Sequence, residues 1–305
     1  MFQPRCPSKN KTTKKEKMIK HWISAARPRT LPTSIAPVIL ATTYAWQQGK
    51  ANWWVFTICM LFALTAQIAS NFANDYFDYK NGSDKPNRVG PRRAVASGDI
   101  KPRTMLTATI ITLVIAAILG CMLIPIGGWQ LVVLGAIIIL FALAYSAGPY
   151  PLSYHGLGEV TVFIFFGIVP VTATYWLQTA TIDIPIIIGA AAMGLLSSNI
   201  LLVNNYRDYQ TDKQDGKRTS VVILGRRFAI ITYLVNGILA TTILATTYTG
   251  AIFAILFLAL HLKTWRGLIK TDGQALNVYI GLTARNQLIF TLLYLAVALI
   301  EATIK

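Results

Sequence analysis

The sequence has few charged residues for its length. Only 13% of its 305 residues are charged, whereas a soluble domain of this size carries about 25%. Hydrophobic residues make up 54% of the chain, and its mean hydropathy is +0.51. Several apolar runs are about 20 residues long, which is enough for a helix to cross a bilayer. These features argue against a soluble domain and predict an all-α polytopic membrane protein.

Cysteine and histidine are also scarce. The three residues of each type lie far apart in the chain: Cys6, Cys59, Cys121, His21, His155 and His261. Their spacing fits neither a disulfide framework nor a zinc site. Cys59 and Cys121 lie within apolar runs and are expected to be small buried hydrophobic residues. A metal site in this protein is therefore expected to use oxygen ligands.

Acidic residues number only 12, against 28 lysines and arginines. Three of the 12 fall in the stretch 71–84, at the end of a long apolar run. On a helix, Asn71, Asn74, Asp75 and Asp78 share one face, because they are spaced at i, i+3, i+4 and i+7. Carboxylate and amide oxygens suit Mg²⁺ better than Zn²⁺. The stretch therefore predicts a magnesium site at the end of a membrane helix.

A second stretch repeats this pattern. Residues 204–209, NNYRDY, match residues 74–79, NDYFDY, at four of six positions, and Asp212 follows Asp208 at i+4. If the two halves of the chain face each other, these carboxylates crowd together and repel one another in a low dielectric. The pattern predicts one shared site that holds both a metal and an anion.

Basic residues follow both acidic stretches in the sequence. The candidates are Lys85, Arg88, Arg92, Arg93, Lys217 and Arg218. Carboxylates, Mg²⁺ and guanidinium groups together would bind a diphosphate, with Asn71, Asn74 and Asn204 supporting the ligands. The alternative is a belt of salt bridges at the membrane interface, but the asparagines would have little to do in such a belt.

The apolar runs predict about nine spanning helices, arranged as two four-helix pseudo-repeats plus a ninth helix around a central cavity. Together they form a single domain over residues 21–305. Residues 1–20 form a basic tail, which is either solvated or rests on anionic lipid. The predicted spans are 33–49, 53–79, 104–124, 129–147, 159–179, 184–206, 228–248, 251–264 and 286–302.

The distribution of lysine and arginine predicts the orientation of these spans. All but two of the 28, Lys50 and Lys305, lie on one side of the predicted topology. The positive-inside rule places this side, with the N-terminus and both acidic stretches, in the cytoplasm, and the C-terminus outside. The net charge of +16 is thus mostly a topology signal, and we expect no nucleic-acid partner.

Six motifs resemble the UbiA superfamily of intramembrane aromatic prenyltransferases. They are RPRTLP at 27–32, NDYFD at 74–78, GSDKP at 82–86, GLGE at 156–159, NNYRD at 204–208 and GKRT at 216–219. The two aspartate motifs mark the superfamily, and the GSDKP and GLGE stretches resemble its 1,4-dihydroxy-2-naphthoate branch, which acts in menaquinone synthesis. The resemblance covers about residues 22–300 and leaves the N-terminal tail out.

The resemblance implies a reaction and a place for it. Mg²⁺ held by Asp75, Asp78, Asp208 and Asp212, with Asp84 as a further candidate, would bind the diphosphate of a polyprenyl donor. After the allylic C–O bond ionises, the naphthoate ring would attack, lose CO₂ and give demethylmenaquinone. The enzyme would lie in the bacterial inner (plasma) membrane, with its active site on the cytoplasmic side and the prenyl tail between helices open to lipid.

Two sets of roles stay open in the sequence. Tyr76, Tyr145 and Tyr150 would shield the allylic cation or contact the acceptor, or else belong to an interfacial aromatic belt. Arg207, which aligns with Phe77, would contact the diphosphate or the acceptor carboxylate, or pair structurally with one of the first-motif aspartates.

Two alternative functions also remain. One is transfer to another aromatic acceptor, such as 4-hydroxybenzoate or homogentisate. The other is transport, because polar sites between parallel repeats also occur in transporters. The acidic residues lie at the ends of the predicted spans rather than at their middle, which argues against transport.

Overall fold

The computed structural model describes residues 14–82, 89–145, 148, 150–246 and 248–304, and within them every regular element is helical. The elements are α1 (Lys14–Ala26), η1 (Pro28–Thr30), α2 (Pro32–Gln47), α3 (Trp53–Lys80), α4 (Pro102–Cys121), α5 (Ile124–Gly127), α6 (Gln130–Ala144), η2 (Leu152–Tyr154), α7 (Gly158–Phe163), η3 (Ile164–Ile168), α8 (Val169–Thr179), α9 (Ile184–Gln214), α10 (Ser220–Leu224), α11 (Arg226–Thr241), α12 (Tyr248–Leu268), η4 (Gly273–Ala275) and α13 (Leu276–Ile304).

Six helical segments of the described chain are long and apolar enough to cross a membrane. They are α3, α4, the continuous segment Gly158–Thr179, α9, α12 and Gly273–Ile304. The prediction of an all-α, multi-pass membrane protein is therefore confirmed. The helices α2, α6 and α11 coincide with the other three predicted spans but have only 16, 15 and 16 residues.

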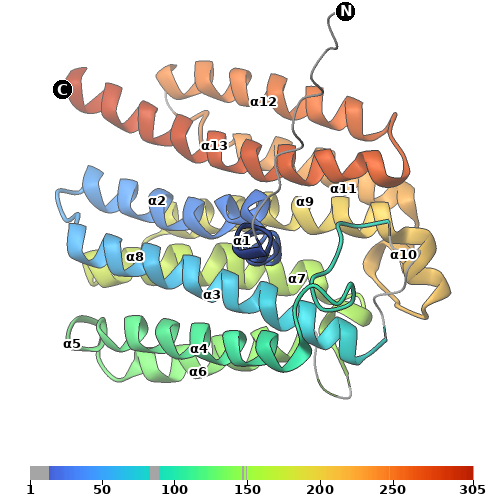
Figure 1. Ribbon diagram of the computed structural model, residues 1–305. Helices are drawn as coiled ribbons and strands as arrows, with labels where there is room; N and C mark the ends of the chain where they lie inside the picture. Colours follow the sequence, from blue (N-terminus) through green and yellow to red (C-terminus); the bar gives the residue numbers. More distant parts are fainter. Residues whose placement is uncertain (1–13, 83–88, 146–147, 149, 247, 305) are drawn as a thin grey trace, which may run out of the picture.

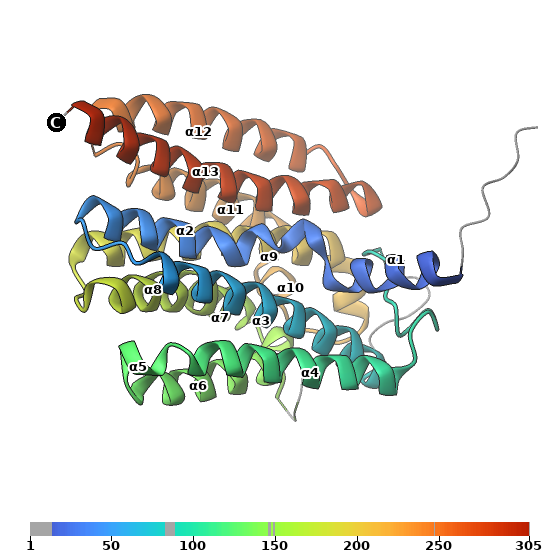
Figure 2. The same cartoon turned by 60° about the vertical axis from the view of Figure 1, so that its left-hand side comes forward.

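The long helices lie side by side in one bundle (Figure 1), with α12 and α13 at one edge and α4 and α6 at the opposite edge. The helix α1 runs across this direction and is seen end-on in Figure 1, whereas Figure 2 shows it projecting from one end of the bundle. The ends of α3, α9 and α12 and the starts of α4 and α13 meet at this same end, which we call the loop end.

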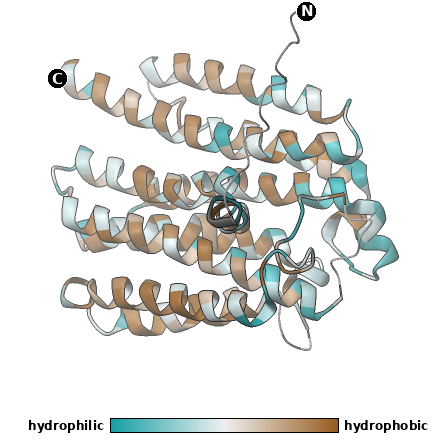
Figure 3. Ribbon diagram, viewed as in Figure 1, coloured by the Kyte–Doolittle hydropathy of each residue, from teal (hydrophilic) through white to brown (hydrophobic). Residues whose placement is uncertain are grey.

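Apolar surface on the outer helices agrees with a lipid environment. The helix α4 exposes Ile110, Ile111, Val114, Ile115 and Ile118, each by 45% or more. Soluble monomers rarely expose so many neighbouring apolar side chains. Figure 3 shows apolar residues along the helices and polar residues concentrated at the loop end.

The helix α9 forms the centre of the bundle. In the most apolar 18-residue stretch of α9, 72% is buried inside the protein, against 17–33% in the corresponding stretches of the other spanning candidates. It contacts α7, α8, α11 and α13, and a Cβ placed on Gly167 of η3 would lie 2.3 Å from Gly194 of α9. Only glycines permit this approach, which draws the η3 segment onto α9 and so positions the start of α7 next to the second aspartate motif.

Side-chain caps fix the starts of α3 and α9 at the end opposite the loop end. Asn52 Oδ1 accepts hydrogen bonds from the amides of Trp54 and Val55, and Asp183 Oδ1 accepts one from Ile186. Such caps each stabilise a helix by about 1 kcal/mol. Since both aspartate motifs lie at the C-terminal ends of their helices, these caps set the motifs at matching depth at the loop end.

Candidate active site

Two adjoining cavities open near the loop end. The larger has a volume of about 790 Å³ and the smaller about 260 Å³. Both are lined by Asn74, Arg93, Tyr145, Leu201 and Asn204. These shared residues form the boundary between the two cavities, so that a molecule could extend from one into the other.

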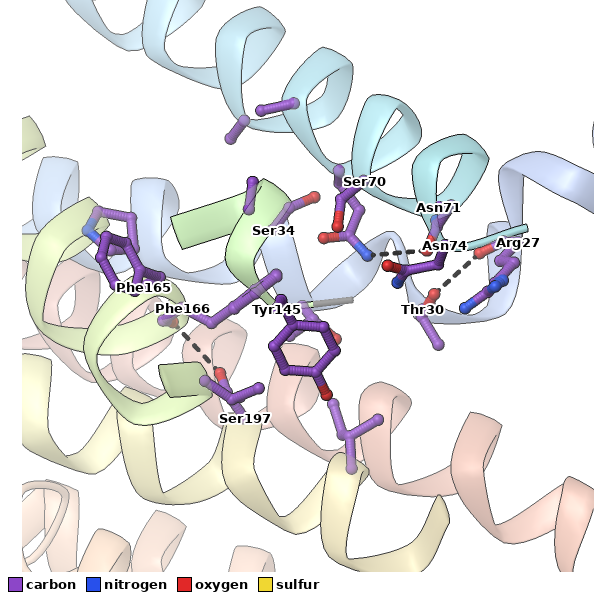
Figure 4. A pocket seen from close by; sticks show the side chains of 18 of the residues that line it. Arg27, Thr30, Ser34, Ser70, Asn71, Asn74, Tyr145, Phe165, Phe166 and Ser197 are labelled. Carbon is purple, nitrogen blue, oxygen red and sulfur yellow. Dashed lines mark hydrogen bonds between the residues drawn. The ribbon is translucent and has the colours of Figure 1, made fainter. Parts of the chain in front are cut away.

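The large cavity changes character along its length. At the loop end it is polar, with Ser24, Thr30, Asn71 and Asn277 in its wall. Toward the opposite end its wall is apolar, formed by residues of α3, α6, η3 and α8 and of the turn before α5, such as Phe62, Leu134, Phe165, Leu177 and Leu123. In Figure 4, Tyr145 projects between the polar wall that carries Arg27 and Asn74 and the wall that carries Phe165, Phe166 and Ser197.

The small cavity is acidic. Among the described residues, four carboxylates line it, from Asp78 on α3 and from Asp208, Asp212 and Asp215 on or next to α9, against two cations, Arg93 and Lys217. The two aspartate motifs, 130 residues apart in the chain, therefore come together as two walls of one chamber. We call this cavity the acidic chamber.

The first motif divides between the two cavities. Asn74 and Asp78, which are spaced at i, i+4, line the acidic chamber, whereas Asp75 lines only the large cavity. Neighbouring residues on a helix point about 100° apart, so Asp75 cannot share the direction of Asn74. Its two carboxylate oxygens accept hydrogen bonds from the backbone amides of Ala94 and Val95, at 3.1 and 3.2 Å.

Asp75 is thus an attachment point for the segment 89–101. It is only 2% exposed, and Ala94 and Val95 pack with Phe72 and Met105 in one apolar cluster. The segment places Arg93 beside the chamber, where its Nη2 donates to Asp78 Oδ2 at 2.9 Å.

The second motif carries its own countercharge. Arg207 donates two hydrogen bonds to the Asp208 carboxylate, one of 2.7 Å from Nε and one of 2.5 Å from Nη2. The Arg207 side chain is fully buried. Arg207 Nη2 also donates to Asn204, and Nη1 to Asn277 of α13. Asn277 in turn donates to Val89 O. This chain of contacts joins α9, α13 and the segment 89–101 around the chamber.

The other predicted anion contacts lie in different places. Asn71 donates to Ala26 O at 2.9 Å and thereby holds the end of α1. Arg92 is exposed and donates to Asp99.

The basic residues after the second motif also differ from each other. Lys217 lines the chamber, and its ammonium group lies over the ring of Tyr154, 4.6 Å from the centroid, whereas Arg218 is exposed. Asp84, Lys85 and Arg88 lie outside the described residues.

Of the three predicted aromatic residues, Tyr145 lines both cavities. Tyr76 packs beside Phe77 and against the cluster around Phe72. Tyr150 is 58% exposed and stacks on His155.

The carboxylates of the acidic chamber suit a Mg²⁺ ion that is held jointly by the protein and by substrate phosphates. Within the described residues, no three His, Cys, Asp or Glu side chains gather closely enough to enclose a metal ion. Mg²⁺, however, is commonly held by one or two carboxylates together with substrate phosphates rather than by an all-protein cage. Carboxylates on opposite walls of one chamber suit that mode, in which the ion and the phosphates bridge the walls.

Sequence reasoning missed two residues next to the chamber. Glu159 Oε1 accepts from Asn205 Nδ2 at 2.8 Å and from Ser220 Oγ at 2.6 Å, so it ties α7, α9 and α10 together. Its place in the GLGE stretch was the available signal. Arg27 lines the large cavity with a left-handed backbone, φ 54°. Its place in the RPRTLP stretch was the available signal, but residue type gave no sign of this backbone conformation.

The fold and the site define an intramembrane helical enzyme with an acidic chamber that adjoins a large, mostly apolar cavity. The model of the UbiA prenyltransferase family matches residues 34–279. This chain belongs to that family and is a prenyltransferase.

Relatives with assigned activities include two bacterial 1,4-dihydroxy-2-naphthoate octaprenyltransferases. The one from Escherichia coli is 39% identical over 67% of this chain and 68% of its own length. The one from Mycobacterium tuberculosis is 41% identical over 67% of this chain and 70% of its own.

Solved structures share the fold. A UbiA homolog from Archaeoglobus fulgidus bound to GPP and Mg²⁺ superimposes with a TM-score of 0.64, at 16% identity, over 92% of this chain and 98% of its own. The apo structure of a UbiA homolog from Aeropyrum pernix gives 0.67, at 13% identity, over 86% of this chain and 97% of its own.

Proposed function

We propose that this protein transfers a polyprenyl group from polyprenyl diphosphate to 1,4-dihydroxy-2-naphthoate. In this reaction the ring exchanges its carboxylate, released as CO₂, for the prenyl group, and diphosphate leaves with the electron pair of the C–O bond. The product is demethylmenaquinol, the hydroquinone form of demethylmenaquinone. The bacterial relatives that carry this activity support the choice of acceptor.

The observation that carries the proposal is the junction of the two cavities. A polyprenyl diphosphate has a highly charged head and a long apolar tail, and it needs two unlike environments in contact. The acidic chamber would take the head with its metal, and the apolar length of the large cavity would take the tail. The boundary residues Asn74, Tyr145 and Asn204 would then lie beside the scissile bond.

The donor set of the chamber would hold the diphosphate with Mg²⁺. We assign this role to Asn74 and Asp78 on one wall and to Asp208 and Asp212 on the other. Mg²⁺, when bound, would offset the charge that develops on the leaving diphosphate. The Arg93 and Lys217 side chains would contact the outer phosphate oxygens, which a guanidinium and an ammonium group suit. The Archaeoglobus fulgidus homolog, whose structure is bound to GPP and Mg²⁺, supports the choice of a prenyl diphosphate and Mg²⁺ as the ligands.

Arg207 and Tyr145 would act around the reacting atoms. Arg207 orients Asp208 through its two hydrogen bonds, so that the carboxylate is available without a rearrangement. Tyr145 stands at the boundary, where its ring can face the allylic carbon and shield positive charge from water. The surrounding apolar wall would exclude water from the cation and so favour attack by the acceptor.

We also infer nine spanning helices, counting α2, α6 and α11 with the six long segments. In this topology α2, α3, α4 and α6 form one half, the segments from α7 to α12 the other, and α13 closes the bundle. The lysine and arginine distribution places the loop end, and hence the active site, on the cytoplasmic side of a bacterial plasma membrane, with the C-terminus outside.

The test is product formation in isolated membranes that contain the protein. They would receive a polyprenyl diphosphate, Mg²⁺ and either 1,4-dihydroxy-2-naphthoate or 4-hydroxybenzoate, with EDTA as control. We expect prenylated product and CO₂ from the naphthoate alone, both lost with EDTA. Product from the benzoate alone would keep the acidic chamber but overturn the acceptor. The absence of product from both would overturn the proposed reaction.

A further inference from the structure

The two cavities carry opposite charge at the loop end. Of the described residues that line the large cavity, six are basic and one, Asp75, is acidic; the basic ones are Lys20, Arg27, Arg29, Arg92, Arg93 and Arg207. The single carboxylate already accepts two backbone hydrogen bonds. The acidic chamber next to it shows the reverse balance. The polar end of the large cavity therefore favours an anion without a metal ion.

The second substrate of the proposed reaction is such an anion. Its carboxylate would be repelled by the carboxylates of the acidic chamber unless the metal and the diphosphate occupied them. When the metal and the diphosphate are bound, the diphosphate occupies the acidic chamber and takes the place that the acceptor carboxylate would need. The acceptor carboxylate consequently needs a separate positive site, close enough to place the ring against the allylic carbon.

The six basic residues differ in position and burial. Arg93 also lines the acidic chamber, and the Arg207 side chain is fully buried against Asp208. Lys20, Arg29 and Arg92 are exposed, whereas Arg27 is half-buried in the corner between α1 and η1. Arg27 thus combines a position in the cavity wall with partial shielding from solvent, which strengthens its interaction with an anion.

The backbone of Arg27 is unusual. Its φ and ψ, 54° and 64°, lie in the left-handed region, which within the described chain only Ala180 shares among non-glycine residues. Glycine or asparagine would adopt this conformation with less strain. Local hydrogen bonds hold it: Arg27 N donates to Ser24 O, and both Thr30 N and Thr30 Oγ1 donate to Arg27 O. Strained residues of this kind cluster at functional sites.

Contacts with α3 fix the corner that carries Arg27. Asn71 of α3 donates to Ala26 O, next to Arg27, at 2.9 Å. Trp22 of α1 packs edge-on against Phe72 of α3, with ring centroids 5.4 Å apart. Arg27 and the boundary residue Tyr145 both line the large cavity. Figure 4 shows Arg27, Asn71 and Asn74 along the same wall.

We propose that Arg27 is the anchor for the acceptor carboxylate, bound at the polar end of the large cavity beside the acidic chamber. The fork of N–H groups on a guanidinium matches a carboxylate in a bidentate fashion, so it also sets the orientation of the aromatic ring. The anchor rests on the proposed function and names the part of the site that selects aromatic carboxylates.

The anchor would act on binding rather than on the chemical step. A guanidinium stabilises the carboxylate but not the CO₂ that it becomes, so Arg27 would lower the acceptor KM without assisting decarboxylation. Its loss should therefore raise the acceptor KM more than it lowers kcat, which is the pattern of a lost ground-state contact.

The test compares Arg27→Gly and Arg27→Asn with the wild type in membranes. Both replacements tolerate the left-handed backbone while they remove the guanidinium. We expect the acceptor KM to rise about 10- to 100-fold, as for the loss of one charge-assisted hydrogen-bond pair, and the polyprenyl diphosphate KM to change less than twofold. Arg103→Gln, which removes an exposed basic residue outside both cavities, is the matched control and should leave both KM values unchanged.

A second measurement uses the wild type alone. The competitive inhibition by 1-hydroxy-2-naphthoate should be at least tenfold stronger than that by its uncharged amide, and the difference should vanish in Arg27→Asn. Equal acceptor KM values in the wild type and both variants, with the wild type active, would overturn the anchor and leave the reaction in place. A wild type that binds polyprenyl diphosphate but prenylates no naphthoate would overturn the proposed function and the anchor with it.

Discussion

The two aspartate motifs have related sequences, but the positive charge that balances the fifth-position aspartate comes from a different place in each. In α3, the countercharge for Asp78 is Arg93, which comes from the segment 89–101. In α9, the countercharge for Asp208 is Arg207, its neighbour in the same helix. The countercharge for Asp78 therefore comes from a loop, whereas the countercharge for Asp208 comes from the same helix.

In both halves the second residue of the motif forms hydrogen bonds with a neighbouring segment of the chain. Asp75 holds the amides of Ala94 and Val95, and the aligned Asn205 holds Glu159 at the start of α7. Both attach a neighbouring segment to the helix that carries the motif. In both motifs the first and fifth positions line the acidic chamber. The second position hydrogen-bonds a neighbouring segment, and of the two second positions only Asn205 also lines the chamber.

The largest effect is expected from the fifth positions. Asp78→Asn and Asp208→Asn each remove a charge that faces the chamber, and each should lower kcat/KM about a hundred- to a thousandfold, because charge stabilisation at the leaving group is lost. The measurement is turnover in membranes at several Mg²⁺ concentrations. Asp99→Asn, outside both cavities, serves as the control. Full turnover with an unchanged Mg²⁺ dependence in either chamber variant would remove that residue from the site.

A smaller and different effect is expected at Asp75. In Asp75→Asn, one oxygen that accepts a backbone amide is replaced by an NH₂ group, which should reduce the free energy of unfolding by about 1–3 kcal/mol. The segment that places Arg93 would loosen, so the KM for polyprenyl diphosphate should rise. The Mg²⁺ concentration for half-maximal rate should stay as in the wild type, because Asp75 does not line the chamber.

Thermal unfolding in detergent and a Mg²⁺ titration of the rate separate the two possible roles of Asp75. If Asp75→Asn changed the Mg²⁺ concentration for half-maximal rate but not the stability, Asp75 would be a metal ligand. The conclusion that the second position of each motif has a structural role would then be wrong. Asp78→Asn is the matched variant, since it should shift the Mg²⁺ concentration for half-maximal rate, which Asp75→Asn should leave unchanged.

The sequence predicted the helical bundle and the meeting of the two motifs because both depend on periodicity. Apolar runs of membrane length become helices, and a spacing of i, i+4 puts Asn74 and Asp78 in one direction. The periodicity could not separate Asp75 from its neighbours. Its direction matters only once the segment 89–101 has packed against α3, and that packing rests on contacts distant in sequence.

The same reason explains the missed residues. Glu159 gains its role from partners on α9 and α10, which lie 46 and 61 positions away. Arg27 gains its place from a backbone conformation that its residue type does not favour. Sequence patterns report what a residue prefers locally, and both of these residues are positioned by tertiary contacts.

The smallest effect is expected at Asn205, the counterpart of Asp75. Asn205→Ala removes a neutral donor from Glu159, which keeps its 2.6 Å hydrogen bond from Ser220, so the free energy of unfolding should fall by about 1–2 kcal/mol. Because α9 carries its own countercharge, the KM for polyprenyl diphosphate should change less than in Asp75→Asn. Steady-state kinetics beside thermal unfolding would measure both quantities, with Asn205→Asp as a harsher variant that sets two carboxylates against each other. A larger KM change in Asn205→Ala than in Asp75→Asn would mean that the α9 wall also depends on a neighbouring segment, and the asymmetry between the two halves would then be wrong.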